Sequence, residues 1–313
     1  MKSKRINQYI RIFGIILFFY ILSRIDLREL ASIIKGMNLF YFLIAFVILA
    51  FSFLLGILKW RILINSQDLK IPFGILVRAY LKGLFLGVIT PGKLGEFWKT
   101  KYLTKAVNIS PGKAFYTVLM DRLMDVMIMV MVGTVGVINF LLLNRIEGGW
   151  LLISLILLLA VFIAYFLIKK EKTEKFLGFF LRFFVPASLK ERMGSFLDEF
   201  FKGMNRLDFR LFLKLVICGF SYYSISVLFY YFLALSLGIP IAFFQLFLII
   251  ALVWLVLIIP ITILGIGTRE ASYIFFFAIL NIKIPLAVAF SALILAVTVL
   301  SVIPGAILFL KDK

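Results

Sequence analysis

Long apolar runs constrain this chain more than any other feature of its sequence. A helix needs roughly 18–20 apolar residues to cross a bilayer, and several runs of Leu, Ile, Phe, Val and Ala reach that length. Hydrophobic residues make up 64% of the 313 residues, well above the roughly 45–50% of soluble domains. The apolar segments are 8–24, 39–58, 73–90, 114–143, 150–168, 211–238, 242–263, 271–282 and 286–310. The sequence therefore predicts a single polytopic all-α integral membrane domain over residues 1–313.

The formal net charge is +19, and the basic residues gather in the links between apolar segments. An excess of Lys and Arg marks cytoplasmic loops. The basic links are the N-terminus, the 59–70 region, the 93–113 segment, the 169–210 stretch and the C-terminus. We therefore expect both termini of a cell-membrane protein to be cytoplasmic. No basic soluble module accompanies these charges, which argues against nucleic acid as a partner.

The chain contains no histidine and one cysteine, Cys218. These absences exclude Ser-His and Cys-His nucleophile pairs, most zinc sites and a disulfide within the chain. We therefore expect no metal site, no cofactor and no catalytic residue, and the sequence favours a role other than that of an enzyme.

Two links between apolar segments have amphipathic patterns. Residues 27–37 form a short one, and residues 169–210 combine aromatic and aliphatic positions at helical spacing with many charges. The longer link predicts one or two cytoplasmic helices that lie on the membrane surface.

A helix break follows the apolar segment 73–90, at Pro91, Gly92 and Gly95, and it ends in Glu96. If 73–90 crossed the bilayer fully, the lysines of 93–113 would lie outside, against the positive-inside rule. A re-entrant hairpin over 73–108 removes this conflict. Non-helical backbone at membrane depth is tolerated where protein or a watery cavity covers it.

The same pattern returns near the C-terminus, where Pro260, Gly265 and Gly267 precede Arg269 and Glu270. In both places the glutamate lies 15 residues before a proline that opens the next apolar segment. We therefore predict about six full spans and two broken hairpins, in repeat-like units 39–143 and 211–310 related as inverted repeats. Paired interrupted segments of this kind point to a transport site near the bilayer midplane. The alternative is that both segments are kinked full spans.

Ionisable residues inside membrane segments are candidates for function, because each is costly there. Arg78 and Lys82 share one helix face and could hold a lipid phosphate, or both could reach the cytoplasmic interface. Asp121 and Asp125 also share a face, beside Arg122, and their repulsion calls for a compensating cation. Arg122 or a lysine of 93–113 could supply this cation. The alternative to a functional role is a structural salt-bridge cluster at the interface.

Glu96 and Glu270 have two interpretations. Each glutamate could stabilise the start of a half-helix, whose free amides form the positive end of the dipole. Each could instead be a proton or cation site, or a partner of Arg122 or Arg269.

Three motifs, Pro91–Glu96, Asp121–Asp125 and Gly265–Glu270, resemble the signature of the lysylphosphatidylglycerol synthase transmembrane region, or flippase-like domain family. The resemblance covers nearly the whole chain in motif order and spacing. Some members join this membrane region to a cytosolic aminoacyl-transfer domain whose lipid product it flips. The 313 residues hold no such domain, so the resemblance implies a stand-alone member and argues against synthase activity. Other relatives are linked to polyprenyl-phosphate sugar pathways.

The resemblance implies a transporter or flippase for an anionic, aminoacylated or polyprenyl-linked membrane lipid. Arginine and lysine side chains would contact phosphate, and the carboxylates would contact a cationic headgroup or carry a proton. The predicted substrate-binding residues are Arg78, Lys82, Glu96, Asp121, Arg122, Asp125, Arg269 and Glu270. Two alternatives stay open: a membrane enzyme such as a lipid-linked aminoacyl or glycosyl transferase, and a scaffold for a separate lipid-modifying synthase.

Overall fold

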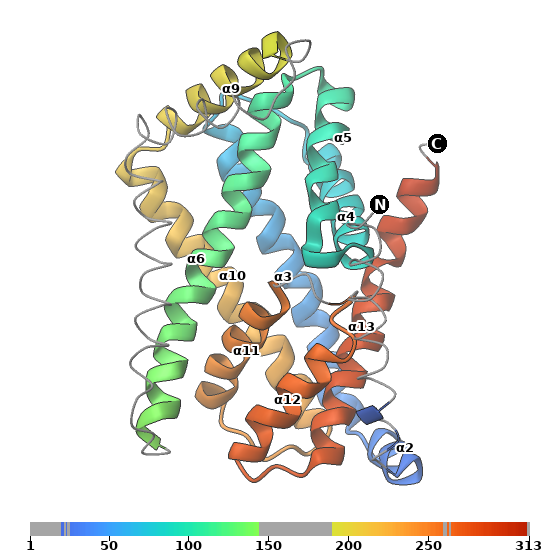
Figure 1. The fold of residues 1–313 in the computed structure, drawn as a ribbon. Helices are drawn as coiled ribbons and strands as arrows, with labels where there is room; N and C mark the ends of the chain where they lie inside the picture. The colour runs from blue at the N-terminus through green and yellow to red at the C-terminus, as the bar shows by residue number, and fades with distance from the viewer. Residues whose placement is uncertain are drawn as a thin grey trace, which may run out of the picture. The chain divides into compact units, whose positions relative to one another are not determined.

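The computed structural model describes residues 20, 21, 23, 26–143, 190–258, 262 and 264–311. These residues form helices joined by short turns, with no strand among them (Figure 1). Four helices in this part of the chain are long and apolar enough to cross a membrane. They are α3 (Leu39–Asn65), α6 (Pro111–Leu143), α10 (Phe209–Ser236) and α13 (Ile284–Lys311). The predicted all-α membrane class is confirmed.

The four long helices correspond to four of the six predicted full spans. The other two, 8–24 and 150–168, lie outside the described residues, apart from residues 20, 21 and 23. Helix α3 also runs further than predicted, to Asn65 rather than to residue 58, so that Lys59 is part of the helix and not of a link. With 27 residues, it is about 40 Å long.

Four shorter helices occur in two pairs, each pair separated by a break. Helices α4 (Phe73–Ile89) and α5 (Trp98–Val107) flank the 3₁₀ turn Pro91–Phe97, and α11 (Phe243–Ile258) precedes α12 (Thr268–Ile279). The longest of the four has 17 residues, which gives a length of about 26 Å. A typical hydrocarbon core is roughly 30 Å thick, so all four are shorter than the roughly 20 residues of a usual spanning helix, and α4 lies at the lower end of the range of about 17–25 residues.

The helix order repeats along the chain with a constant offset. Helices α10, α11 and α12 begin 170 residues after α3, α4 and α5 respectively. A long helix closes each series, α6 in the first and α13 in the second. The described chain thus contains twice the sequence of one long helix, two short helices and one long helix.

The chain divides into two compact units, each made of several segments. One contains Met1–Leu54, Leu81–Glu96 and Tyr222–Lys313, and the other contains Leu55–Tyr80 and Phe97–Ser221. In the first unit, α12 packs against α13 and α11, and the short helix α2 (Leu27–Lys35) packs against α13. In the second unit, α6 packs against α5 and α9 (Lys190–Asn205), as Figure 1 shows.

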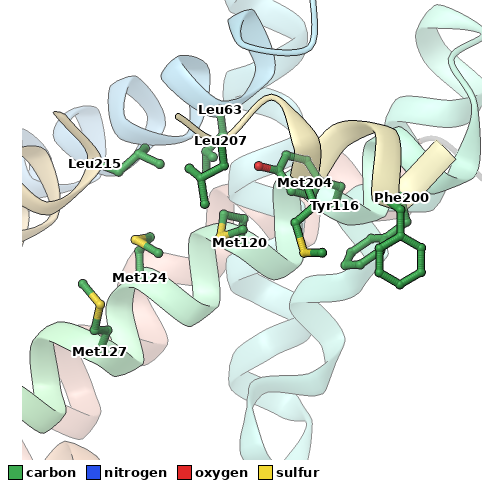
Figure 2. Close-up of a cluster of buried hydrophobic side chains, with 10 residues drawn as sticks. Leu63, Tyr116, Met120, Met124, Met127, Phe200, Met204, Leu207 and Leu215 are labelled. Carbon is green, nitrogen blue, oxygen red and sulfur yellow. The ribbon is translucent and has the colours of Figure 1, made fainter. Parts of the chain in front are cut away.

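Helix α9 is the described part of the polar stretch 169–210, whose residues 169–189 lie outside the described ranges. Its amphipathic pattern is as predicted, and its apolar face packs against α6. Phe200 and Met204 of α9 meet Met120 of α6, and Figure 2 shows Met120, Met124 and Met127 along one side of that helix. The ring of Phe200 also lies 6.0 Å from that of Phe115 and 5.9 Å from that of Tyr116, centre to centre, so α9 buries aromatic surface against α6.

Candidate functional site

The first break is held by the side chain of Thr90. Its hydroxyl donates to the carbonyl of Leu86 at 2.7 Å and accepts the backbone N–H of Gly95 at 2.6 Å. Gly92 and Lys93 have positive φ angles of 61° and 57°, which turns the backbone out of the helix. A Cβ on Gly95 would lie 2.1 Å from the carbonyl oxygen of Leu86, so only glycine allows this close approach.

The side chain of Glu96 lies on the side of the first break that faces α4. It is 2% exposed and packs over Gly87 of α4, where a Cβ would meet its Cγ at 2.5 Å. Glycine at position 87 therefore makes room for a buried carboxyl group.

After the break, the chain returns alongside the helix it has just left. Lys99, the second residue of α5, is fully buried, and its Nζ lies 4.7 Å from the ring centre of Tyr80 in α4. The same ammonium lies 5.1 Å from the ring centre of Trp60 in α3. Two aromatic faces around one ammonium group stabilise the buried charge.

A cluster of charged side chains, which we call the charged cluster, joins α3, α5 and α6. Lys59 lies between the two carboxylates of α6, with its Nζ 3.0 Å from Asp121 and paired with Asp125. The Nζ of Lys99 lies 3.9 Å from Asp121. Arg122 approaches Asp121 at 3.9 Å and Asp125 at 3.7 Å, and its side chain is 23% exposed whereas the other four are buried.

Sequence reasoning anticipated part of the charged cluster. It called for a cation beside Asp121 and Asp125, and both Arg122 and a lysine of 93–113, Lys99, lie there. It missed Lys59, the closest cation, because the apolar run ends at residue 58 and the lysine looked like an interfacial charge. The neighbouring Trp60 donates from its indole to Thr117 of α6 at 3.3 Å, which shows that this helix continues against protein beyond the apolar run.

The second break has similar backbone features. Leu264, Gly265 and Gly267 have positive φ angles of 60°, 71° and 85°. The hydroxyls of Thr262 and Thr268 lie 2.8 Å apart across the break. Pro260, also predicted to be part of it, lies outside the described residues.

A network of four residues, which we call the glutamate network, follows the second break. The carboxylate of Glu270 accepts from the backbone N–H of Gly267 at 2.6 Å, from Arg269 Nη2 at 3.0 Å and from the hydroxyl of Ser291 at 2.7 Å. Arg269 Nε donates to the same hydroxyl at 2.9 Å. All three side chains are buried, and Glu270 both caps the start of α12 and neutralises Arg269. The neutral Ser291, inside an apolar helix, gave no signal in the sequence.

The remaining predicted residues have different surroundings. Lys82 is buried at 2% exposure, whereas Arg78 one turn earlier on α4 is exposed. Near Glu96, the Nζ of Lys93 lies 5.8 Å from the ring centre of Trp254 in α11. The first break therefore contacts a helix that leads to the second break.

Comparison with known proteins identifies the family. The model of the lysylphosphatidylglycerol synthase transmembrane region matches residues 10–305, which include both breaks, the charged cluster and the glutamate network. The chain belongs to this family. Its resemblance in three short motifs therefore extends to almost the whole sequence.

Two archaeal members are similar to this chain along most of their length. A UPF0104 membrane protein, PH1989 of Pyrococcus horikoshii, is 25% identical over 321 residues, covering 96% of this chain and 96% of its own. A second UPF0104 membrane protein, MJ1595 of Methanocaldococcus jannaschii, is 24% identical over 286 residues, covering 87% and 84% respectively. Integral membrane location is thus common to this family member and its relatives.

Proposed function

We propose that this protein moves a membrane lipid with an anionic headgroup, aminoacylated or polyprenyl-linked, across the bilayer. The observation that carries the proposal is the charged cluster, which places three cations and two carboxylates among membrane helices. Charges at membrane depth are costly and are usually retained for a substrate or ion pathway. Membership in a family named for the transmembrane region of a lipid synthase supports a lipid as the substrate.

The two pairs of short helices are re-entrant hairpins in this proposal. Helix α11 packs against α12, and Lys99 of α5 contacts Tyr80 of α4, as expected if each pair enters the membrane and returns on the same side. With both termini cytoplasmic and six full spans, α3 and α10 run in opposite directions through the membrane. The constant offset of 170 residues between the two series of helices supports inverted repeats.

Within this arrangement the headgroup passes near the two breaks while the acyl chains stay in the bilayer. Arg78, Lys82, Arg122 and Arg269 contact phosphate, and Arg122 is best placed because it is the partly exposed member of the charged cluster. The carboxylates bind a cationic part of the headgroup or carry a proton. These are Glu96, Asp121, Asp125 and Glu270.

The test is lipid movement in proteoliposomes that contain fluorescent phosphatidylglycerol, followed by quenching of the outer leaflet. Arg122→Gln is expected to slow movement by about tenfold or more, because a charged hydrogen bond to phosphate is lost. Arg61→Gln is the matched control, because Arg61 is an exposed arginine outside the charged cluster. Glu96→Gln and Glu270→Gln are expected to slow movement as well.

No lipid movement by the parent protein with phosphatidylglycerol, its lysyl ester or a polyprenyl phosphate would overturn the proposal. Unchanged movement in the Arg122, Glu96 and Glu270 variants would overturn the residue assignment alone. Co-purification of a lipid-modifying synthase, in the absence of movement, would favour the scaffold role, and product formed from an activated donor would favour an enzyme.

A further inference from the structure

A buried cation occupies the same place at the start of each second short helix. Lys99 is the second residue of α5, and Arg269 is the second residue of α12, 170 residues later. Lys99 is fully buried and Arg269 is 4% exposed. Each contacts the following long helix at a residue 22 positions further along the chain, Asp121 and Ser291 respectively.

These cations occupy unfavourable positions. The first turn of a helix carries the positive end of its dipole, where an acidic side chain is stabilising and a basic one is not. Each half of the chain offsets that cost with a nearby carboxylate. In the first half it comes from Asp121 of α6, and in the second it comes from Glu270 of α12 itself.

The two contacts differ in what holds the helices together. Between α5 and α6 the connection is between opposite charges, the ammonium of Lys99 and the carboxylate of Asp121. Between α12 and α13 the opposite charges belong to one helix, and the connection is the hydroxyl of Ser291, which accepts from Arg269 and donates to Glu270. Removal of either connection therefore weakens the polar contact of one helix pair and leaves that of the other in place.

We propose that Lys99 and Arg269 are equivalent latches, one in each compact unit, which fasten the second helix of each break to the following span. Each latch releases when its unit opens for the passage of a headgroup, and this last step rests on the proposed function. The latch contacts themselves do not depend on it. Because the two latches belong to different units, they control different openings.

The experiment measures how quickly a buried cysteine reacts with a maleimide in protein that carries Cys218→Ser. Leu103→Cys reports on α5, and Ala287→Cys reports on α13, since both positions are fully buried, Leu103 one turn from Lys99 and Ala287 one turn from Ser291, the partner of Arg269. Lys99→Met removes the first latch and leaves Asp121 paired with Lys59 at 3.0 Å. Ser291→Ala removes the second and leaves Arg269 paired with Glu270 at 3.0 Å.

Lys99→Met is expected to speed labelling at position 103 by about tenfold, with little change at 287, and Ser291→Ala is expected to do the reverse. Lys99→Arg and Ser291→Thr keep the cation and the hydroxyl and are expected to restore slow labelling. The controls are Lys101→Met, an exposed cation of α5, and Ser301→Ala, whose hydroxyl donates to Thr298 of its own helix.

Unchanged labelling in both latch variants would overturn the proposal, and so would equal acceleration at both reporters, which would indicate general loosening. If Lys99→Met does not fold, Lys99→Gln takes its place in the same comparison. Lipid movement is measured separately on the same proteins. If labelling is selective but the parent moves no lipid, the latch proposal stands and the proposed function is overturned. If the parent moves lipid but labelling is not selective, only the latch proposal is overturned.

Discussion

The carboxylate of Glu270 accepts the backbone N–H of Gly267 at 2.6 Å, so a residue of the first turn of α12 closes the break that precedes it. The same carboxylate pairs with Arg269 at 3.0 Å, and both side chains are buried. One side chain therefore caps the helix and neutralises a buried guanidinium. Its loss should affect stability before any substrate is present.

We expect Glu270→Gln to lower the free energy of unfolding by about 3–5 kcal/mol, because it leaves Arg269 buried without a counter-charge. Chemical denaturation in detergent micelles measures the change. Arg269→Gln combined with Glu270→Gln should recover part of the loss, since the double variant contains no unpaired charge at this position. Glu29→Gln on the exposed face of α2 is the control. Equal losses for Glu270→Gln and Glu29→Gln would contradict the role of the network.

Gly95 tests the geometry of the first break. A Cβ at this position would lie 2.1 Å from the carbonyl oxygen of Leu86 and 2.7 Å from the hydroxyl of Thr90, and the backbone atom cannot move aside cheaply. We expect Gly95→Ala to destabilise the protein by about 1–3 kcal/mol or more. Gly74→Ala in α4 is the matched control, because no heavy atom lies within 4 Å of its added Cβ. Thermal unfolding of the two variants measures the difference in stability, and similar midpoints would contradict the steric requirement for glycine at position 95.

The sequence was sufficient to predict the membrane class, the four long helices that the structure describes and the breaks at Pro91–Glu96 and before Arg269. Apolar length sets the spans, and Pro and Gly interrupt helices for local reasons that a sequence displays directly. The aspartate pair also showed its need for a cation. Lys59 and Ser291 could not be found in the same way, because their importance comes from neighbours more than 20 residues away. The packing of α9 on α6 was missed for the same reason, since an amphipathic pattern does not say what covers its apolar face.

The charged cluster offers a test that separates stability from activity. Lys59→Met leaves Asp121 and Asp125 without their closest cation, and we expect it to cost about 3–5 kcal/mol of unfolding free energy. Adding Asp125→Asn to the same protein should restore part of that stability, because the repulsion between the two carboxylates is then absent while Asp121 stays beside Lys99 and Arg122. Denaturation in micelles measures this recovery, with exposed Arg61→Met as the control.

Lipid movement by that double variant then shows what the pair of Lys59 and Asp125 is for. Under the proposed function it folds but moves lipid at least about tenfold more slowly than the parent, because two of the charges that guide the headgroup are gone. Normal movement by a stable double variant would mean that this pair serves only the fold.

The packing of α9 on α6 predicts that loss of a buried side chain of α9 will make this helix open more readily. Phe200 is 7% exposed and lies among Tyr116, Met120 and Met204, so Phe200→Ala should remove about 3–5 kcal/mol of packing energy. Trypsin cleavage at the exposed Lys202 should become at least about tenfold faster, because cleavage requires α9 to open locally.

Phe209 provides the matched comparison, since it is also a phenylalanine near a helix end but is 77% exposed. Phe209→Ala should leave the rate of cleavage at Lys202 close to that of the parent. A second comparison uses Gly203, whose added Cβ would lie 2.9 Å from the Tyr116 ring, so that Gly203→Ala should also speed cleavage. If α9 lay on the lipid surface instead, Phe200→Ala and Phe209→Ala would have similar effects, because neither side chain would lose a protein partner.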